Sequence, residues 1–462
     1  MTSTSRLPNS ASTAITFFQS ELHGVSSARE EKQKDTTIQP LIIPRSEHNI
    51  SRANISKNAV KVLYRLHKAG YEAHLVGGAV RDMLLGREPK DFDVATDATP
   101  EQVRELFRNC RLIGRRFRLA HVHFGPEIIE VATFRSAQPS PEEEHQNDEG
   151  MILRDNIYGT IEEDAIRRDF TVNALYYNIA DFSIIDYAGG VEDINRGELK
   201  LLGDPEQRYR EDPVRMLRAV RFAAKLGFRI TDETLKPIGK LADLLDGVPA
   251  ARLFEETLKL FMAGQAYETF HLLHQYGLLK YLFPLTESVM SGDYDQRITE
   301  MIDQGLKNTD ERIETGKPVT PAFLFAVLLW EPVRELAAEL RQEEEIADIP
   351  ALQQAASQVL SGQAQRVSIP KRFTLMMRDI WTLQPRFQNR AGKRPLRLLA
   401  HPKFRAAYDF MLLRAQAGEV EQELADWWTS YQAVSGDERG KMSRSGNRQP
   451  RRRRRSKTKQ QP

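Results

Sequence analysis

Two aspartates one residue apart, Asp91 and Asp93, follow shortly after two adjacent glycines, Gly77 and Gly78. Carboxylates held side by side repel each other unless a cation lies between them, and their hard oxygen atoms suit Mg²⁺. Glycines at a turn allow the backbone to approach a phosphate closely. In this order the two motifs indicate metal-assisted chemistry on a nucleotide.

The glycine pair is expected at a turn between a strand and a helix. The sequence predicts a short buried strand over residues 74–76 and a helix over 79–85. The free N–H groups of the first helical turn would point at a bound anion. Arg81 lies one turn further and carries a fork of donors, so Gly77, Gly78 and Arg81 are candidate nucleotide-binding residues.

The aspartates are expected on a strand over residues 90–95. Side chains two apart on a strand share one face, so Asp91 and Asp93 would project together while Phe92 and Val94 face the core. Taken alone, Asp-x-Asp is more often a solvated pair and Gly-Gly more often a plain turn. Their combination at one strand edge favours a functional site.

Three segments carry a family resemblance. Residues 77–82 with 91–93, then 167–174 (RRDFTVNA), then 211–222 (EDPVRMLRAVRF), resemble the class II nucleotidyltransferases, which are the CCA-adding enzymes and the bacterial poly(A) polymerases. The segment 112–122 resembles the stretch that marks the poly(A) polymerase branch. The resemblance covers roughly residues 49–300. It implies an α/β nucleotidyltransferase head, built on a mixed sheet with flanking helices, followed by an all-α neck and body.

The resemblance also implies roles for individual residues. The aspartate pair would hold two Mg²⁺ ions, one at the 3′-hydroxyl of an RNA primer and one at the triphosphate of ATP. Asp91, Asp93 and Asp169 would then be catalytic, with Asp169 at the sugar or in catalytic support. Nucleotide contacts, with Arg168 at phosphate, are implied for Asp164, Arg168, Asp212, Arg215 and Arg218.

Two of these positions have open alternatives. Glu130 lies in an apolar run, residues 128–132, and is either a third metal ligand or a glutamate on an edge strand facing water. Asp169 precedes a predicted helix over residues 170–177 and could simply cap it.

Asp212 and Arg215 suggest how a base could be chosen. A helix predicted over residues 211–226 would place them on one face, where the carboxylate accepts and the guanidinium donates. Adenine and cytosine offer the matching donor and acceptor on their pairing edges, whereas guanine and uracil offer the reverse. The pair therefore predicts ATP or CTP over GTP and UTP, without separating the first two. An intrahelical salt bridge is the alternative.

Positive charge is concentrated at the C-terminus. The net charge is +2, but residues 439–462 hold eleven Lys or Arg and no acid, which leaves 55 basic and 64 acidic residues elsewhere. The tail lacks apolar periodicity, so it is expected to be disordered and to bind RNA phosphates through counterion release. The candidate RNA-binding residues are Arg451, Arg452, Arg453, Arg454, Arg455, Lys457 and Lys459.

Length and composition predict a cytoplasmic protein of several domains. The chain has 462 residues, no apolar run long enough for a membrane span, and a single cysteine, Cys110, which excludes an internal disulfide. The predicted units are a flexible polar arm (1–48), a catalytic head (49–195), a helical neck completing the nucleotide pocket (196–260), a helical RNA-binding body (261–434) and a disordered Arg-rich tail (435–462).

Three hypotheses follow. The favoured one is a template-independent poly(A) polymerase that adds AMP from ATP to RNA 3′ ends and releases pyrophosphate. Its expected partners are mRNA, decay intermediates and RNA-decay proteins. The second is a CCA-adding tRNA nucleotidyltransferase, and the third is a noncatalytic RNA-binding protein in which Asp91 and Asp93 are solvated acids.

Overall fold

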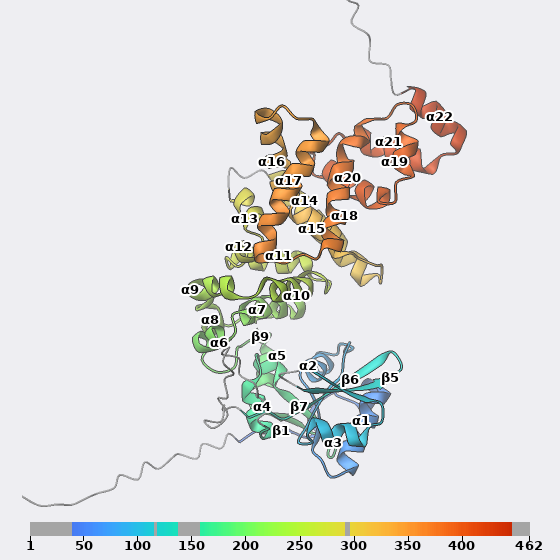
Figure 1. Cartoon of the computed structure of the whole chain (residues 1–462). Coiled ribbons are helices and arrows are strands. Elements are labelled where there is room, and N and C mark those ends of the chain that lie inside the picture. The colour runs from blue at the N-terminus through green and yellow to red at the C-terminus, as the bar shows by residue number, and fades with distance from the viewer. Residues whose placement is uncertain (1–38, 115–117, 137–157, 292–295, 446–462) are drawn as a thin grey trace, which may run out of the picture. The chain divides into compact units, whose positions relative to one another are not determined.

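An eight-stranded mixed sheet organises the N-terminal part of the chain (Figure 1). The computed structural model describes residues 39–114, 118–136, 158–291 and 296–445. The strand order is β1-β8-β7-β2-β3-β6-β5-β4, in which β3 and β6 are parallel and the other neighbours antiparallel. The strands are β1 (Leu41–Ile43), β2 (Ala73–Val76), β3 (Asp93–Thr96), β4 (Cys110–Ile113), β5 (Leu119–Phe124), β6 (Glu127–Thr133), β7 (Leu175–Asn178) and β8 (Ile184–Asp186).

Helices cover both faces of the sheet. Leu75, Val94 and Val131 face the large core, to which α1 and α3 contribute, and Val76 and Tyr176 pack with α4 on the other face. This arrangement follows from strand alternation, since neighbours along a strand point to opposite faces. The predicted α/β head is therefore confirmed. Its helices are α1 (Lys57–Lys68), α2 (Gly78–Leu84), α3 (Pro100–Leu106), α4 (Ile161–Arg167) and α5 (Gly190–Arg196).

The predicted arm over residues 1–48 extends too far. Residues 1–38 lie outside the described residues, but Leu41–Ile43 form β1, which pairs antiparallel with β8. Leucine and isoleucine suit a strand, and Ile43 is buried by the pairing. The sheet therefore begins before residue 49.

The helix predicted over residues 170–177 is wrong. Thr171–Asn173 form a single 3₁₀ turn, and Leu175–Asn178 form β7, which lies between β2 and β8. Tyr176 and Tyr177 are buried there, and aromatic side chains pack well on a pleated surface. Pairing on both sides of the strand therefore overrides the helix-like spacing of apolar residues.

The neck is mostly helical, but a short parallel ladder joins β9 (Glu198–Leu199) to β10 (Arg229–Ile230), so it is not all-α. The predicted continuous helix over residues 211–226 is also wrong. It breaks at Asp212 and Pro213, because a residue before proline is pushed out of the helical conformation. The neck helices are α6 (Pro205–Glu211), α7 (Val214–Leu226), α8 (Asp232–Leu235), α9 (Ile238–Leu241) and α10 (Ala250–Phe261).

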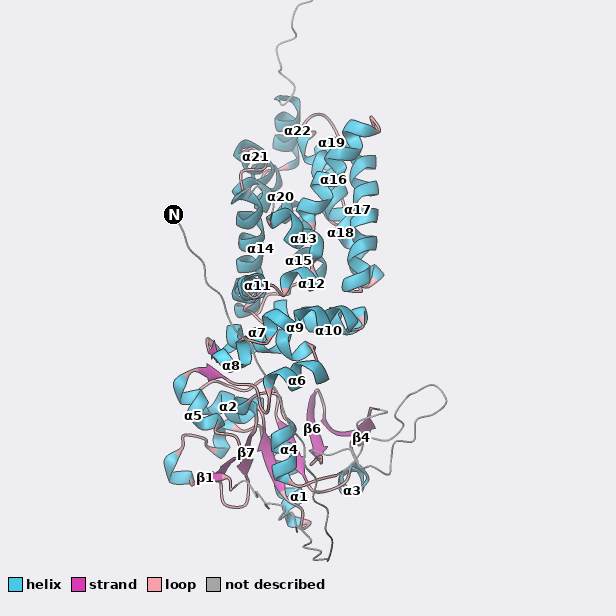
Figure 2. Ribbon diagram, turned by 90° about the vertical axis from the view of Figure 1, so that its left-hand side faces the viewer, coloured by secondary structure: helices cyan, strands magenta, loops and turns pink. Residues whose placement is uncertain are grey.

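In its described residues, the body contains helices and no strand (Figure 2). The spacing of apolar residues in the sequence predicts a helix over residues 252–263 at the end of the neck and helices over 267–276, 322–330, 372–383 and 405–417 in the body. All five are present within two residues. The helices are α11 (Ala266–Gln275), α12 (Leu279–Leu282), α13 (Pro284–Met290), α14 (Gln296–Glu314), α15 (Pro321–Leu328), α16 (Trp330–Glu343), α17 (Asp348–Arg366), α18 (Lys371–Leu383), α19 (Arg394–Leu399), α20 (Phe404–Gln416) and α21 (Gln422–Ala433).

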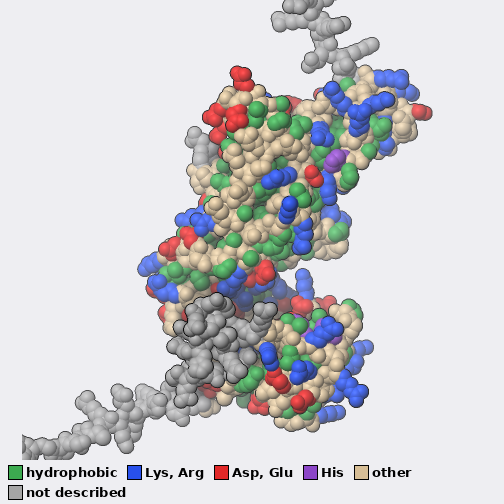
Figure 3. Space-filling view, viewed as in Figure 1, with side chains coloured by type: hydrophobic (Ala, Val, Ile, Leu, Met, Phe, Trp, Pro, Cys, Tyr) green, Lys and Arg blue, Asp and Glu red, His purple; other side chains and the backbone are tan. Residues whose placement is uncertain are grey.

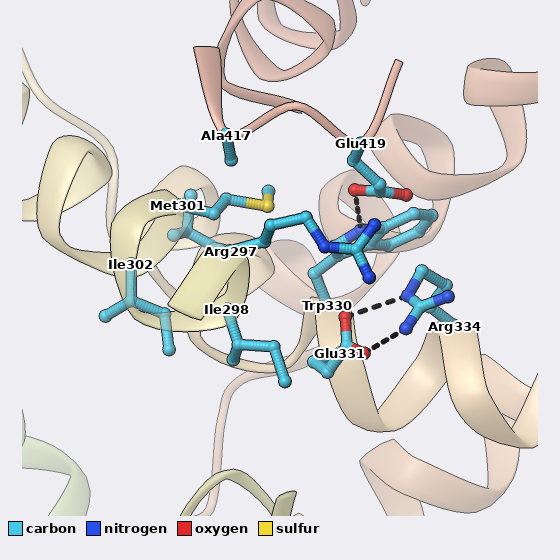
Figure 4. Close-up of a pocket in the computed structure, with 10 residues that line it drawn as sticks. Arg297, Ile298, Met301, Ile302, Trp330, Glu331, Arg334, Ala417 and Glu419 are labelled. Atoms are coloured by element: carbon cyan, nitrogen blue, oxygen red, sulfur yellow. Dashed lines mark hydrogen bonds and ion pairs between the residues drawn. The ribbon is translucent and has the colours of Figure 1, made fainter. Parts of the chain in front are cut away.

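A polar network joins α16 to the turn after α20 (Figure 4). Trp330 Nε1 donates to Glu419 at 2.9 Å, and Arg414 donates to the same carboxylate at 2.8 Å. Beside them, Arg334 forms a two-point contact with Glu331. Trp330 is buried, so its indole N–H needs such a partner. The network therefore connects α16 to α20 and to the turn that follows it.

The predicted disordered tail begins too early. Gly436–Ser445 form α22, in which the Arg439 guanidinium donates to the carbonyls of Tyr431 and Gln432 at the end of α21. Cations at a helix C-terminus satisfy carbonyls that lack a helical partner.

In the described part of the chain, no helix is long and apolar enough to cross a membrane.

Candidate active site

A row of paired residues crosses the sheet at the expected site. Tyr176 on β7 pairs with Val76 on β2, Val76 with Asp93 on β3, Asp93 with Glu130 on β6, and Glu130 with His121 on β5. Directly paired residues point to the same face. Five separate strands therefore bring these side chains together.

The glycine turn begins where this row crosses β2. Gly77 follows Val76, and its φ of +69° lies in the left-handed region that glycine tolerates. A Cβ built on Gly77 would come within 3.2 Å of Arg168 Nη1. Gly77 is therefore required for both its backbone conformation and the close approach of a guanidinium.

Asp91 and Asp93 line one open pocket together with Glu130 and His121. Asp93 opens β3 and Asp91 precedes the strand, so only Asp93 has strand geometry. Phe92 between them packs against the core, as predicted. Burial of the Asp93 carboxyl and the negative charges of Glu130 and Asp91 raise its pKa to about 6, although Arg168 opposes the shift. The carboxylates therefore lie close enough to repel one another.

Glu130 lies on an interior strand, since β6 is flanked by β3 and β5, so the prediction of an edge strand is wrong, whereas the prediction that Glu130 faces water is correct. It is exposed on the face that carries Asp93, and its Oε1 lies 3.5 Å from His121 Nε2. The structure thus places a third carboxylate beside the aspartate pair, with water access.

The donor chemistry fits Mg²⁺. Among the described residues, no three His, Cys, Asp or Glu side chains form a ready-made metal cage. Mg²⁺ does not require one, because it commonly takes one or two carboxylates and completes its shell with substrate phosphate and water. Burial and then the negative charges of Glu130 and Asp91 raise the pKa of Asp93, and a bound divalent cation would relieve the repulsion between these carboxylates.

Arg81 has its guanidinium beside the glycine turn, with Nη2 3.4 Å from the position of a Cβ on Gly78, but its donors are already engaged. Its side chain is 2% exposed, and it donates to Asp82 at 2.6 Å and 2.9 Å and to Asn173 Oδ1. A phosphate contact would require these buried bonds to break. The structure therefore places Arg81 as a support for the segment around Asn173.

Three partners hold Arg168. Its Nη1 donates to the carbonyl of Asn173 at 3.4 Å. Its Nη2 donates to Asp164 at 3.0 Å, and its Nε donates to the Tyr176 hydroxyl at 2.9 Å. The Tyr176 hydroxyl donates in turn to Asp164 at 2.7 Å. Asp164 thus fixes Arg168 and Tyr176. Arg168 remains about one-quarter exposed beside Gly77, where a phosphate could reach it.

Asp169 links the head to α7. Its carboxylate accepts from Arg218 Nε at 2.9 Å, from Asn173 Nδ2 at 3.1 Å and from the N–H of Phe170 at 2.8 Å. Burial alone would raise the pKa of Asp169, but the Arg218 guanidinium and these hydrogen bonds hold it below its usual value. Asp169 therefore stays ionised and orients Arg218.

Asp212 and Arg215 do not pair with each other. Asp212 lies between α6 and α7 and accepts from Arg252 at 2.8 Å, whereas Arg215 donates to Glu211 at 2.9 Å. The intrahelical salt bridge between Asp212 and Arg215 is absent from the structure. Both side chains remain partly exposed at the start of α7.

Sequence reasoning missed three supporting residues. Asn173 bridges Arg81 and Asp169, Tyr176 holds Arg168, and Arg252 holds Asp212. Asn173 lies inside the RRDFTVNA segment, so that motif offered a signal. Tyr176 and Arg252 become evident only through tertiary contacts. The predicted RNA-binding residues at 451–455, 457 and 459 lie outside the described residues.

Comparison with solved structures defines the fold. A tRNA-processing enzyme in its apo form aligns with a TM-score of 0.57 at 22% identity, covering 84% of this chain and 94% of that one. The chain therefore shares the fold of that enzyme.

Family profiles and relatives narrow the class. The profiles that match are "Poly A polymerase head domain" (73–200), "Probable RNA and SrmB- binding site of polymerase A" (227–290) and "Polymerase A arginine-rich C-terminus" (344–461). Poly(A) polymerase I of Salmonella typhi is 54% identical over 426 residues, which cover 90% of this chain and 92% of that protein. The CCA-adding enzyme of Bacillus pumilus is 39% identical over 203 residues, covering 44% and 49%. The chain belongs to the poly(A) polymerase family.

Proposed function

We propose that the chain is a template-independent polymerase that transfers AMP from ATP to RNA 3′ ends. In this reaction the 3′ oxygen forms a bond to the α-phosphorus, and the bond to pyrophosphate breaks. The carrying observation is that Asp91, Asp93 and Glu130 line one pocket, and that Asp93 pairs with Val76, the residue before Gly77. Similarity to poly(A) polymerase I over nine-tenths of the chain supports AMP transfer over CCA addition.

Asp91 and Asp93, with Glu130 beside them, would hold two Mg²⁺ ions. When bound, these ions would make the 3′-hydroxyl a better nucleophile and neutralise the leaving pyrophosphate. The residues of the chain would hold the nucleotide in position for this reaction. The turn at Gly77 would admit a phosphate to the backbone, and Arg168 would contact it from the opposite side.

Base choice is proposed to lie at the start of α7. The Asp212 carboxylate would accept the adenine amino group, and Arg215 would donate to the neighbouring ring nitrogen. Arg252 would orient Asp212, and Arg218, fixed by Asp169, would contact the nucleotide. The start of α7 belongs to the neck, which follows the sheet in sequence. The packing of the neck helices would therefore set the size of the pocket that distinguishes ATP from CTP.

RNA is the proposed polymer substrate. The profile described as a probable RNA-binding and SrmB-binding site covers residues 227–290, and the arginine-rich profile includes the basic residues 451–459. We extend this to cytoplasmic mRNA and decay intermediates, with RNA-decay proteins as partners. Contacts through the basic residues would depend on salt and not on sequence.

One series of incubations tests the proposal. Purified protein, Mg²⁺, an unstructured RNA and a tRNA lacking its CCA end are mixed with each labelled nucleotide in turn. Long ATP-only extension of both RNAs is expected. Addition of three nucleotides to the tRNA alone would favour a CCA-adding enzyme. Binding without incorporation would make the protein noncatalytic.

A further inference from the structure

An open groove lies in the body between α14, α15, α18 and α20, and none of the residues that line it belongs to the sheet. Its volume is about 530 Å³. Pockets for small ligands typically measure roughly 300–1,000 Å³. The groove is therefore large enough to take a group the size of a nucleobase, and its open side leaves room for the rest of a polymer.

The groove combines an apolar floor with a cationic rim. Phe323, Met376, Leu412 and Leu413 supply apolar surface. The lining carboxylates are Glu311 and Asp409, and Asp409 is engaged by Arg405 at 3.0 Å. Arg312 donates through Nε and Nη2 to the carbonyl of Pro318, which leaves Nη1 for a ligand. The four rim cations, which outnumber the carboxylates, are Arg312, Lys317, Lys403 and Arg405.

The rim continues into a segment without acidic residues. From residue 380 to residue 408 the sequence holds seven Lys or Arg and no Asp or Glu. Arg386, Lys393 and Arg397 are exposed, and within the described residues none has a carboxylate partner. Figure 3 shows Lys and Arg side chains gathered over the end of the body that carries α19, α21 and α22.

This basic segment is rigidly supported. Phe387, Leu398 and Phe404 are buried in a second hydrophobic core, with Trp428 packed against two of their rings. Trp428 Nε1 also donates to the carbonyl of Phe387 at 2.9 Å. The cations are therefore presented on folded chain, unlike a charge run with no apolar anchors.

We propose that the groove and the acid-free segment form one binding site for single-stranded RNA. A base would enter the apolar floor, and the flanking phosphates would contact Lys317, Lys403 and the cations of residues 386–405. Single strands bind where a positive path runs beside surfaces that accept unstacked bases. An acidic protein segment would match the charge but not the base-sized apolar floor. This inference rests on the proposed function, which makes RNA the substrate.

The test measures binding without turnover. The probe is a fluorescent oligoadenylate ended by 3′-deoxyadenosine, so it cannot be extended. The full-length variant carries Lys317→Gln and Lys403→Gln. The matched control carries Lys57→Gln and Lys68→Gln, two exposed lysines on α1 in the head. Anisotropy is recorded between about 50 and 200 mM salt, the range over which phosphate contacts are most visible.

Loss of two phosphate contacts should lower the slope of log affinity against log salt by about 1.4, since each contributes about 0.7 for a single strand. The control should keep the slope of the unsubstituted protein. Oligoadenylate bearing photoreactive 8-azidoadenosine should cross-link to peptides that contain Phe323 or Leu412. An unchanged slope, or cross-links that avoid both peptides, would overturn the proposal and leave the groove to a protein ligand. A protein that binds this probe but fails to incorporate AMP would refute the polymerase and not the groove.

Discussion

The guanidinium of Arg168 lies against Gly77, where an added Cβ would come within 3.2 Å of Nη1. The contact joins the turn after β2 to the segment after α4, although about ninety residues separate them in sequence. Asp164 and Tyr176 hold Arg168 in this position. Nucleotide binding should therefore be sensitive to small changes on either side.

Gly77→Ala should raise the KM for ATP about tenfold, because the methyl group displaces Arg168 and strains a backbone at φ +69°. Gly86→Ala is the matched control, since Gly86 has the same φ of +69° and nothing within 4 Å of its added Cβ. Steady-state kinetics on both variants separate contact from strain. Equal effects would show that Arg168 is not involved.

Asp91→Asn and Asp93→Asn should each lower kcat about a thousandfold, because metal stabilisation of transition-state charge amounts to several kcal/mol. RNA binding should change less than about twofold, because single exposed charges contribute little to a polyanion contact. Asp97→Asn, at the residue that follows the far end of β3, is the control and should remain active. Robust turnover by either active-site variant would refute the metal role.

Tyr176→Phe should raise the KM for ATP about tenfold with little change in kcat. The lost hydroxyl leaves Arg168 Nε and Asp164 without a shared partner, and hydrogen bonds to charged groups contribute about 1.5–3 kcal/mol. Tyr209→Phe loses a buried hydroxyl bonded to the carbonyl of Thr234 in the neck. An equal rise in KM for both variants would indicate a general loss of stability.

Arg252→Ala should reduce discrimination for ATP against GTP about tenfold, since a well-placed pair of hydrogen bonds distinguishes bases by about 1–3 kcal/mol. Arg252 acts through Asp212, which accepts from it at 2.8 Å. Arg366→Ala removes a comparable exposed pair with Asp246 and should leave the ratio unchanged. Competition between labelled ATP and GTP measures the effect, and an unaltered ratio in Arg252→Ala would exclude this route.

Asp169→Asn should destabilise the protein at pH 7 by about 2 kcal/mol, less than a fully buried pair would lose because Arg218 is one-third exposed. The folded pKa of Asp169 is depressed, so its stabilisation is complete above the unfolded value of 3.8 and lost as the pH falls through the folded pKa. The difference between the urea midpoints of the variant and the unsubstituted protein should therefore shrink as the pH falls below 3.8. The control variant Glu192→Gln loses an exposed ion pair with Arg196, and its urea midpoint should equal that of the unsubstituted protein at pH 7 and at pH 3. A constant gap between pH 7 and pH 3 would contradict the assigned ion pair.

Local patterns predicted much of the head. The strand at residues 74–76, the glycine turn and the core-facing Phe92 follow from short-range periodicity and were predicted correctly. The body helices follow for the same reason. Leu175–Asn178 could not be assigned this way, because its strand state depends on two neighbours distant in sequence.

Predicting the roles of individual side chains was harder. Arg81 has the donors for phosphate, yet Asp82 and Asn173 satisfy them inside the fold. The sequence leaves two alternatives for Glu130, a metal ligand or an edge-strand residue. Its pairing with Asp93 shows that it lies on the same face of the sheet as that aspartate. The residue type shows which interactions a side chain can make. Only the tertiary contacts show which of its donors and acceptors remain available for a ligand.

The chain break at Asp212 and Pro213 has an evolutionary consequence. Arg252 on α10 orients Asp212, whereas the side chain of Arg215 in the adjoining helix donates to Glu211. If Asp212 reads the base as proposed, substitutions outside the EDPVR motif would therefore alter nucleotide preference, and relatives with the same motif would differ in the nucleotide they favour.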